Sequence, residues 1–189
     1  MIKIAVVGDI GSGKSHIAKL FGYPVFNADL EVAEIYKTNK NCFKRLKKNL
    51  PNYFLVFPAN KMQIIKAIED SEKNLKKITK IIHPEVRKKL SIFLKKNKKR
   101  KAIILDIPLL LENKLNQKND ILVFVQSKKR EIIKRLKKRD NFNLNLYSQF
   151  KKMQLPLSYK KKKANHIIKN NFTNKLVKIS VKKILEEII

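Results

Sequence analysis

The sequence predicts an α/β fold in which a parallel, five-stranded sheet lies between two layers of helices, a three-layer α/β/α arrangement. Two observations lead to this prediction. Apolar runs of strand length alternate with segments of helical periodicity along the chain. The first of these runs leads directly into Gly8-Asp9-Ile10-Gly11-Ser12-Gly13-Lys14-Ser15, which matches the phosphate-loop (P-loop) pattern G-x-x-x-x-G-K-[ST] between a strand and a helix.

The P-loop predicts a nucleoside triphosphate site. Three of the chain's 4 glycines lie in it, and they let the backbone turn sharply and approach a phosphate closely. Its N–H groups and the N-terminus of the following helix, expected from about Lys14 to Phe21, attract anions. Lys14 would reach the β- and γ-phosphates, and the Ser15 hydroxyl would bind Mg²⁺. The motif does not say which molecule receives the phosphate.

Four further strands are expected, and two of them end near a carboxylate. Asp29 follows the second strand and Asp106 ends the third, so both should lie at the sheet edge where α/β proteins bind ligands. Position alone leaves two interpretations of Asp29 open: a ligand-site carboxylate, or the N-cap of a helix at Leu30–Tyr36. The expected strands are Tyr23–Asn27, Ala102–Asp106, Ile121–Val125 and His166–Ile168.

The stretch from Asn39 to Asn97 has a helical pattern without any strand, which predicts a helical insertion on the substrate side of the sheet. One helix is expected at about Ser71–Ile82, and Pro84 should lie in the first turn of the next. His83, between them, is more typical of a helix start or a core histidine than of a ligand. After the fourth strand, a helix at about Lys128–Lys138 is expected.

Composition limits the possible classes of protein. The 189 residues, 43% of them hydrophobic, suit one domain. A single cysteine, Cys42, excludes a disulfide framework and favours a reducing compartment. No segment approaches the roughly 18 consecutive apolar residues of a membrane-spanning helix. We therefore expect a cytoplasmic protein without a membrane partner; a monomer is the working expectation, although the sequence does not fix the oligomeric state.

The formal net charge of +30 raises the question of a nucleic-acid partner. Lysine is abundant along the whole chain, and runs such as Lys98–Lys101 and Lys160–Lys163 lack the interleaved aromatic residues of a base-stacking surface. Solvated helix faces and loops explain this pattern better than a binding stripe does. We expect no specific nucleic-acid partner, while part of the excess charge suits anionic substrates.

Beyond the P-loop, short motifs recur in a specific order and spacing, and through them the chain resembles the dephospho-CoA kinase family. The likeness covers essentially the whole chain and is weakest from Lys37 to Ile82. Its most specific parts are the H-P-x-V and D-x-P-L-L-x-E patterns. The motifs are Asn27-Ala28-Asp29, His83-Pro84-Glu85-Val86, Asp106 to Glu112, Arg135 to Asp140, Gln154-Leu155-Pro156-Leu157 and Ala164 to Asn170.

The resemblance implies an ATP- and Mg²⁺-dependent transfer of the γ-phosphoryl group to the 3′-hydroxyl of dephospho-CoA, the last step of coenzyme A synthesis. Asp29 would be the base or orienting group for that hydroxyl. Lys14 would hold the phosphates, Ser15 would bind Mg²⁺, and Arg139 with Arg135 would approach the transferring phosphate from the lid. The other residues implied are Gly11, Ser12, Gly13, His16 and Asn170 for ATP, with Asn170 near the adenine, and His83, Asp106 and Glu112 for the acceptor.

The resemblance also implies a division of the chain and a strand order. A P-loop kinase core would comprise about residues 1–29, 101–138 and 164–189, an acceptor-binding helical region about 30–100, and a lid about 139–163. The strand order would be 2-3-1-4-5. The chain departs from the family at four positions: Asn27 and Asn165 replace aspartates, His16 replaces a common threonine, and Phe150 replaces a frequent lid arginine.

Two other functions remain as alternatives. Another small-molecule P-loop kinase, acting on a nucleoside monophosphate or a metabolite, would share the loop but not the segment from Asp106 to Glu112. A basic nucleic-acid-binding ATPase would show nucleic-acid binding that weakens steeply with salt, and ATPase activity stimulated by nucleic acid.

Overall fold

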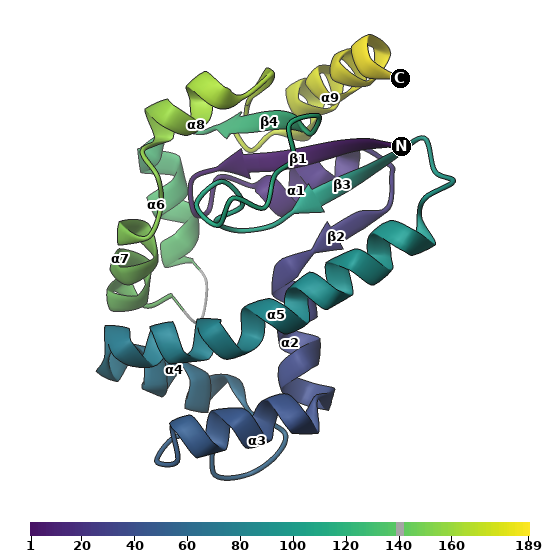
Figure 1. The fold of residues 1–189 in the computed structure, drawn as a ribbon. Helices are drawn as coiled ribbons and strands as arrows, with labels where there is room; N and C mark the ends of the chain where they lie inside the picture. Colours follow the sequence, from purple (N-terminus) through teal and green to yellow (C-terminus); the bar gives the residue numbers. More distant parts are fainter. Residues whose placement is uncertain (139–141) are drawn as a thin grey trace.

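A computed structural model describes residues 1–138 and 142–189 and contains one parallel sheet between layers of helices (Figure 1). The sheet order is β2-β3-β1-β4-β5, and every neighbouring pair is parallel, as the sequence and the family resemblance predicted. Strand β1, which feeds the P-loop, therefore lies at the centre. The strands are β1 (Ile2–Gly8), β2 (Val25–Asn27), β3 (Ala102–Asp106), β4 (Ile121–Gln126) and β5 (His166–Lys169).

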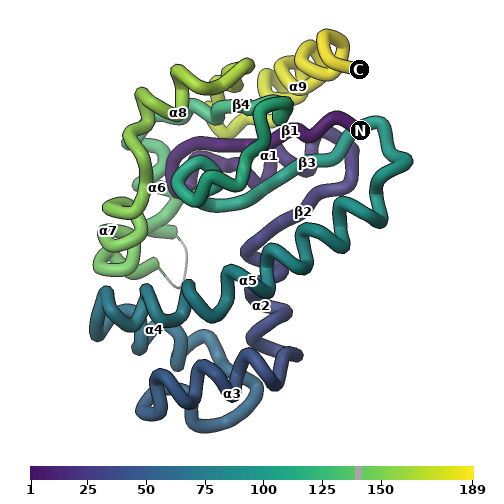
Figure 2. Tube along the Cα trace, viewed as in Figure 1, coloured from purple at the N-terminus to yellow at the C-terminus, as the bar shows by residue number. Residues whose placement is uncertain are grey.

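Alternate side chains of the central strands enter two separate cores, because successive residues of a strand point to opposite faces. Ile4 and Val6 face helices α1 (Lys14–Leu20) and α9 (Asn174–Ile188). Ala5 and Val7 face the other way, where the second half of α5 (Glu72–Lys96) and α8 (Leu157–Lys163) cover the sheet. These two covered faces make the three layers, which can be followed along the chain in Figure 2.

A block of helices extends from the carboxyl end of β2, below the sheet in Figure 1. It consists of α2 (Ala28–Thr38), α3 (Lys40–Asn49), α4 (Lys61–Asp70) and the first half of α5. These helices bury a core of their own, separate from both cores of the sheet, whose largest members include Phe43, Leu46 and Phe54. The expected helical insertion is therefore present and is stabilised by apolar burial.

The prediction for Pro84 was wrong. Pro84 lies inside the single continuous helix α5 and does not begin a new one. A proline inside a helix costs about 3 kcal/mol or more, and burial on both sides of Pro84 offsets this cost. Ile78, Ile81 and Ile82 pack into the core of the helical block, while Leu90 packs against the sheet. One continuous helix thus packs against both the helical block and the sheet.

The N-cap interpretation of Asp29 was also wrong. Helix α2 begins at Ala28, directly after β2, and its N-cap is Asn27, whose side chain accepts a hydrogen bond from Leu30 N at 2.9 Å. Asn caps a helix about as well as Asp does. Asp29 lies in the first turn, so its carboxylate is not needed to begin the helix.

The segment expected to form a lid lies beside the carboxyl ends of the strands (Figure 1). It follows α6 (Lys129–Lys137) and contains α7 (Leu144–Lys152) and α8. The side chain of Lys151, near the end of α7, pairs with Asp9 of the P-loop at 2.5 Å. No helix within the described parts of the chain is long and apolar enough to cross a membrane.

Candidate active site

The P-loop is held in shape by its neighbours. Asn170, after β5, is 5% exposed and donates a hydrogen bond from Nδ2 to the Ser12 carbonyl oxygen at 2.8 Å. Gly13 has φ +93°, and a Cβ there would lie 2.5 Å from that same Nδ2. Only glycine fits this conformation beside Asn170. Asn170 therefore braces the loop; it also lines a cavity of about 590 Å³ outside it.

Lys14 lies over the loop with its ammonium group turned toward backbone oxygens. Its Nζ donates to the Asp9 carbonyl oxygen at 2.8 Å and reaches the Gly8 oxygen at 3.5 Å. Removal from bulk water lowers the pKa of Lys14, while the negative charge of Asp106 acts in the opposite direction. The half-buried amino group thus lies at the place where the motif expects phosphates.

A cavity of about 440 Å³ opens above the loop. It is lined by P-loop residues, by His16, which is hydrogen-bonded to Asn174, and by Arg135 from α6. The guanidinium of Arg135 lies 4.5 Å from the centroid of the Phe172 ring, a cation–π contact. We call this space the phosphate cavity. Its lining includes the predicted residues Gly11, Gly13, Lys14, Ser15, His16, Asp29, Asp106 and Arg135.

Two carboxylates meet at the floor of the phosphate cavity, because β2 and β3 are neighbours and end together. Asp106 is 3% exposed, and its Oδ2 accepts a hydrogen bond from Asn27 Nδ2 at 2.6 Å. Asp29 keeps contact with solvent, but protein surrounds much of its side chain. This partial desolvation raises the pKa of Asp29, and the charge of Asp106 raises it further, against an opposing effect of Lys14.

A second cavity, of about 310 Å³, lies between α2, α4 and α5, and its lining is mostly apolar. We call it the acceptor cavity. It shares Asp29, Pro108, Leu109 and Phe150 with the phosphate cavity. His83 lines it as well, and partial burial together with the charge of Arg87 lowers the pKa of this histidine. The two cavities therefore adjoin at Asp29.

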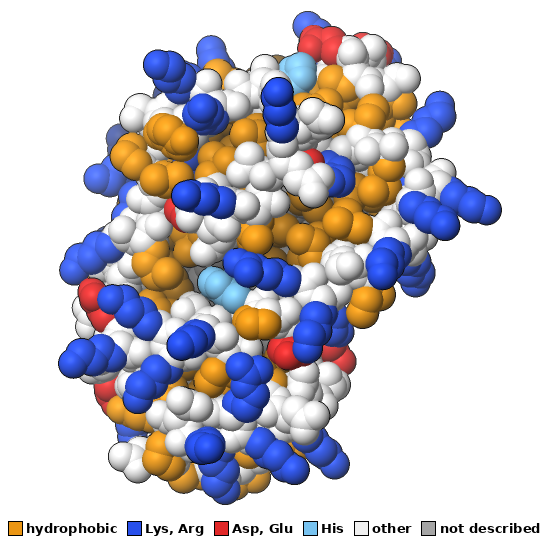
Figure 3. Space-filling view, in the orientation of Figure 1, with side chains coloured by type: hydrophobic (Ala, Val, Ile, Leu, Met, Phe, Trp, Pro, Cys, Tyr) orange, Lys and Arg blue, Asp and Glu red, His pale blue; other side chains and the backbone are white. Residues whose placement is uncertain are grey.

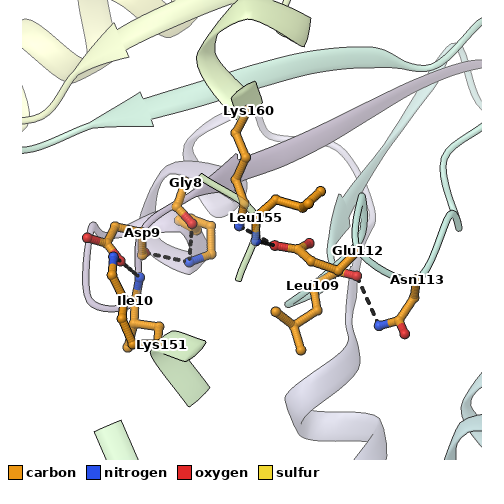
Figure 4. Close-up of polar contacts among 10 residues, drawn as sticks. Gly8, Asp9, Ile10, Leu109, Glu112, Asn113, Lys151, Leu155 and Lys160 are labelled. Atoms are coloured by element: carbon orange, nitrogen blue, oxygen red, sulfur yellow. Dashed lines mark hydrogen bonds and ion pairs between the residues drawn. The ribbon is translucent and has the colours of Figure 1, made fainter. Parts of the chain in front are cut away.

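Glu112 lines neither of these cavities. Its carboxylate pairs with the buried Lys160 of α8 at 2.7 Å and accepts a hydrogen bond from Leu155 N at 2.9 Å (Figure 4). Burial by itself would raise the pKa of Glu112, but the hydrogen bonds from Lys160 and the backbone hold it below its ordinary value. Glu112 thus joins the segment after β3 to the segment after α7.

Comparison with known proteins decides the family. The model of the family described as dephospho-CoA kinase matches residues 2–175. The chain belongs to the dephospho-CoA kinase family. A dephospho-CoA kinase from Wolbachia sp. subsp. Brugia malayi (strain TRS) is 32% identical over 98% of this chain and 97% of its own. One from Wolbachia pipientis wMel is 33% identical over the same shares.

Solved structures agree with the fold. A crystal structure of a protein from Thermus thermophilus covers 100% of this chain and 98% of its own with a TM-score of 0.78 and 26% identity. A dephospho-CoA kinase from Campylobacter jejuni superimposes with a TM-score of 0.67 at 22% identity, covering 98% of this chain and 96% of its own. The second likeness concerns the fold alone.

The donor groups of the phosphate cavity suit Mg²⁺ as this family would use it. Within the described ranges, no group of three or more His, Cys, Asp or Glu residues could hold a metal by itself. Mg²⁺ in kinases is held by one or two protein oxygens together with substrate phosphates, so such a group is not required. Ser15 and Asp29 both line the cavity and offer oxygen atoms.

Some expected residues fall elsewhere, and others were not expected. Arg139 lies outside the described residues. Ser12, within the loop, is fully buried and does not line the phosphate cavity. The structure adds Asn27, which joins the α2 N-terminus to Asp106, and the buried Lys160, neither of which was assigned a role from the sequence. Only the family motifs around them could have drawn attention to these two residues, because their partners are distant in the sequence.

Proposed function

We propose that this protein is an ATP-dependent kinase that transfers the γ-phosphoryl group of ATP to the 3′-hydroxyl of dephospho-CoA, giving coenzyme A and ADP. The observation that carries this proposal is the junction of the two cavities. One is polar and built on a P-loop, the other is largely apolar, and they share Asp29. Family membership supplies the identity of the acceptor.

The P-loop and Lys14 would hold the triphosphate. Phosphoryl transfer depends mainly on positioning and on neutralising charge over the phosphate oxygens. Lys14, which now donates to backbone carbonyl oxygens, would exchange those partners for the β- and γ-phosphates. Mg²⁺ bound by Ser15 and the phosphates would neutralise further charge. His16 and Arg135, both at the cavity wall, support the nucleotide, and Asn170 braces the loop beneath it.

Asp29 is our proposed base or orienting group for the acceptor hydroxyl. A carboxylate whose pKa is raised is a better proton acceptor at neutral pH than an ordinary aspartate. Partial desolvation and the neighbouring Asp106 both raise the pKa of Asp29. Asn27 donates a hydrogen bond to Asp106, so position 27 supplies a neutral donor beside the two carboxyl groups and not a third acid.

The acceptor cavity would take the rest of dephospho-CoA. Its apolar walls on α2, α4 and α5 suit a nucleobase and an alkyl-rich arm better than a second polyphosphate. His83, whose pKa is lowered, would act there as a neutral hydrogen-bonding group. Asp106 would act on the acceptor through Asp29, whose pKa its charge raises. Glu112 would act indirectly, by holding the lid segment through Lys160 and Leu155. The contribution of Arg139 stays a proposal from the family motif.

A coupled assay of ADP release tests this function. With Mg²⁺-ATP, dephospho-CoA should be the preferred acceptor among a panel that includes AMP, CMP and shikimate, and mass spectrometry should find coenzyme A as product. Coenzyme A itself, whose 3′-hydroxyl already carries a phosphate, is the matched control and should give no ADP above background. Faster turnover of any panel member than of dephospho-CoA would overturn the proposal.

The proposed function does not involve a specific nucleic-acid partner. Lysine and arginine side chains are spread over the face shown in Figure 3 and do not gather in one stripe. A cation of this charge should bind oligonucleotides weakly at low salt and lose them near physiological ionic strength. Sub-micromolar binding to a defined oligonucleotide at about 150 mM salt would argue against us. A cytoplasmic monomer is the state we propose.

A further inference from the structure

The buried pair Glu112–Lys160 fixes one end of the lid. Lys160 is 3% exposed, and its ammonium lies 2.7 Å from Glu112 Oε1. That same Oε1 accepts the hydrogen bond from Leu155 N. Lys160 reaches Glu112 from α8, and Leu155 belongs to the link between α7 and α8 (Figure 4). A buried, hydrogen-bonded ion pair is costly to break on one side, so this link is held firmly against the core.

Gln154 is the residue directly before this anchored Leu155. Its side chain lines the phosphate cavity, and it also lines a small gap bordered by Lys14 and Lys160. Gln154 Oε1 is buried and has no hydrogen-bond partner among the described residues. An amide placed in this way has a donor and an acceptor available at the cavity, and its two ends can exchange places by rotation.

We propose that Gln154 is a further phosphate-binding residue, whose carboxamide donates to the terminal phosphate of bound ATP, and that the Glu112–Lys160 pair positions it there. This inference rests on the proposed kinase function. The cavity wall that Gln154 shares with Lys14 and Ser15 is the one that would face the triphosphate. A neutral amide can donate to a phosphate oxygen without the desolvation cost of another buried charge.

Two neighbouring side chains of the lid cannot take the place of Gln154 at a bound phosphate. Phe150, which borders both cavities, has an apolar side chain that cannot donate a hydrogen bond to a phosphate. Lys151, next to it, is engaged with Asp9. Within the described part of the lid, Gln154 is the polar side chain that lines the phosphate cavity.

The first test compares two nucleotides that differ at the terminal phosphate. Titration calorimetry with Mg²⁺ should show that Gln154→Ala weakens binding of the ATP analogue AMP-PNP by about 10- to 100-fold, the usual effect of losing a hydrogen bond to a charged group. Binding of ADP should stay within about twofold of wild type. Gln154→Glu keeps the shape but adds a charge, and it should weaken AMP-PNP binding at least as much.

Gln149 offers a matched control. It lies on α7, and its Oε1 is also buried without a partner among the described residues, but it lines neither the phosphate cavity nor the acceptor cavity. Gln149→Ala should leave both affinities unchanged. Equal losses for ADP and AMP-PNP in Gln154→Ala, no loss at all, or recovery of AMP-PNP binding in Gln154→Glu would each overturn the proposal.

The second test concerns positioning. Replacing the pair by apolar residues of similar size, Glu112→Leu with Lys160→Met, avoids leaving one buried charge alone and should keep the fold. The double variant should lose affinity for AMP-PNP but not for ADP. Adding Gln154→Ala should cause little further loss, because both changes remove the same interaction. Fully additive losses would show that the pair does not act through Gln154. A wild-type protein that binds both nucleotides but does not phosphorylate dephospho-CoA would refute the proposed function and leave this inference standing.

Discussion

The phosphate cavity and the acceptor cavity adjoin, yet they are built in opposite ways. The first is centred on one short stretch of sequence, the P-loop with Lys14, and residues such as Asp106, Arg135 and Gln154 complete its wall. The second is lined mainly by side chains of α2, α4 and α5, with others from the segment after β3 and from α7. Charge and backbone geometry define one site, and apolar shape defines the other.

Because of this difference, we expect the two cavities to respond differently to amino-acid substitutions. A phosphate site depends on a fixed loop and on the charge of a residue such as Lys14, so a single substitution there should lower the rate of transfer strongly. An apolar site is recognised by volume, and each wall residue contributes only a part of the binding free energy. Asp29 is the exception: of the four described residues that line both cavities it is the polar one, and it would orient the acceptor hydroxyl toward the γ-phosphate.

The largest effect is expected in the phosphate cavity. Lys14→Ala should lower turnover by at least about 100-fold, because the lost charge would stabilise the transferring phosphoryl group. Its circular dichroism spectrum and its affinity for dephospho-CoA should stay as in wild type. Lys19→Ala, an exposed lysine on the same helix α1, is the control and should remain fully active. Wild-type turnover of Lys14→Ala would refute the role of the loop.

A smaller effect is expected in the acceptor cavity. Thr79 on α5 lines this cavity, and Thr79→Phe would place a ring in the space for the acceptor. We expect KM for dephospho-CoA to rise by about tenfold or more, the usual scale for an apolar pocket, with KM for ATP unchanged. Thr79→Ser, which removes volume, should stay near wild type. A rise in KM for ATP instead would mean that the cavities have been assigned the wrong substrates.

The smallest effect is a shift in pH dependence. Asn27→Asp would place a carboxylate beside Asp106 and near Asp29, raising the pKa of Asp29 further. Since Asp29 must be ionised to act as a base, activity should then fall on acidification at a pH higher by on the order of one unit. The profile of kcat/KM measures this shift.

Asn27→Asp should also be less stable than wild type at neutral pH. The new carboxyl at position 27 would have a higher pKa in the folded than in the unfolded protein. Its protonation therefore stabilises the folded protein at low pH, and this contribution is lost as the pH rises through the folded-state pKa. Asn165→Asp is the matched control: it makes the same change of side chain, but Asn165 pairs with the Leu122 backbone at the start of β4. Equal pH shifts in both variants would contradict the account of Asn27.

Much of the phosphate cavity could be predicted from the sequence because its information is local. The P-loop, the strand before it and the helix after it follow from adjacent residues, and the five strands follow from apolar runs. The strand order needed the family resemblance. Asp106 could be placed at the sheet edge because parallel strands end together.

The features that the sequence did not predict depend on contacts between residues that are far apart in the sequence. Pro84 was expected to begin a helix, but burial on both sides of it keeps α5 continuous. Asp29 was considered as the N-cap of a helix at Leu30–Tyr36, but α2 begins two residues earlier than expected, at Ala28, and Asn27 caps it. The partner of Glu112 is 48 residues away in the numbering, so no local pattern could connect it to Lys160.

The central claim is that Asp29 joins the two cavities as a catalytic carboxylate, and the variant Asp29→Asn tests it most directly. Turnover with dephospho-CoA should fall by about 100-fold or more, the usual scale of lost general-base catalysis. Affinity for ATP and the melting temperature should stay near wild type, because Asn27, not Asp29, caps α2.

The measurement is ADP release at saturating ATP and dephospho-CoA, with Glu34→Gln as the control because Glu34 is an exposed acid on the same helix. We predict a large loss of turnover for Asp29→Asn and none for Glu34→Gln, with nucleotide binding intact in both. Turnover of Asp29→Asn within a few-fold of wild type would contradict the account at its central residue.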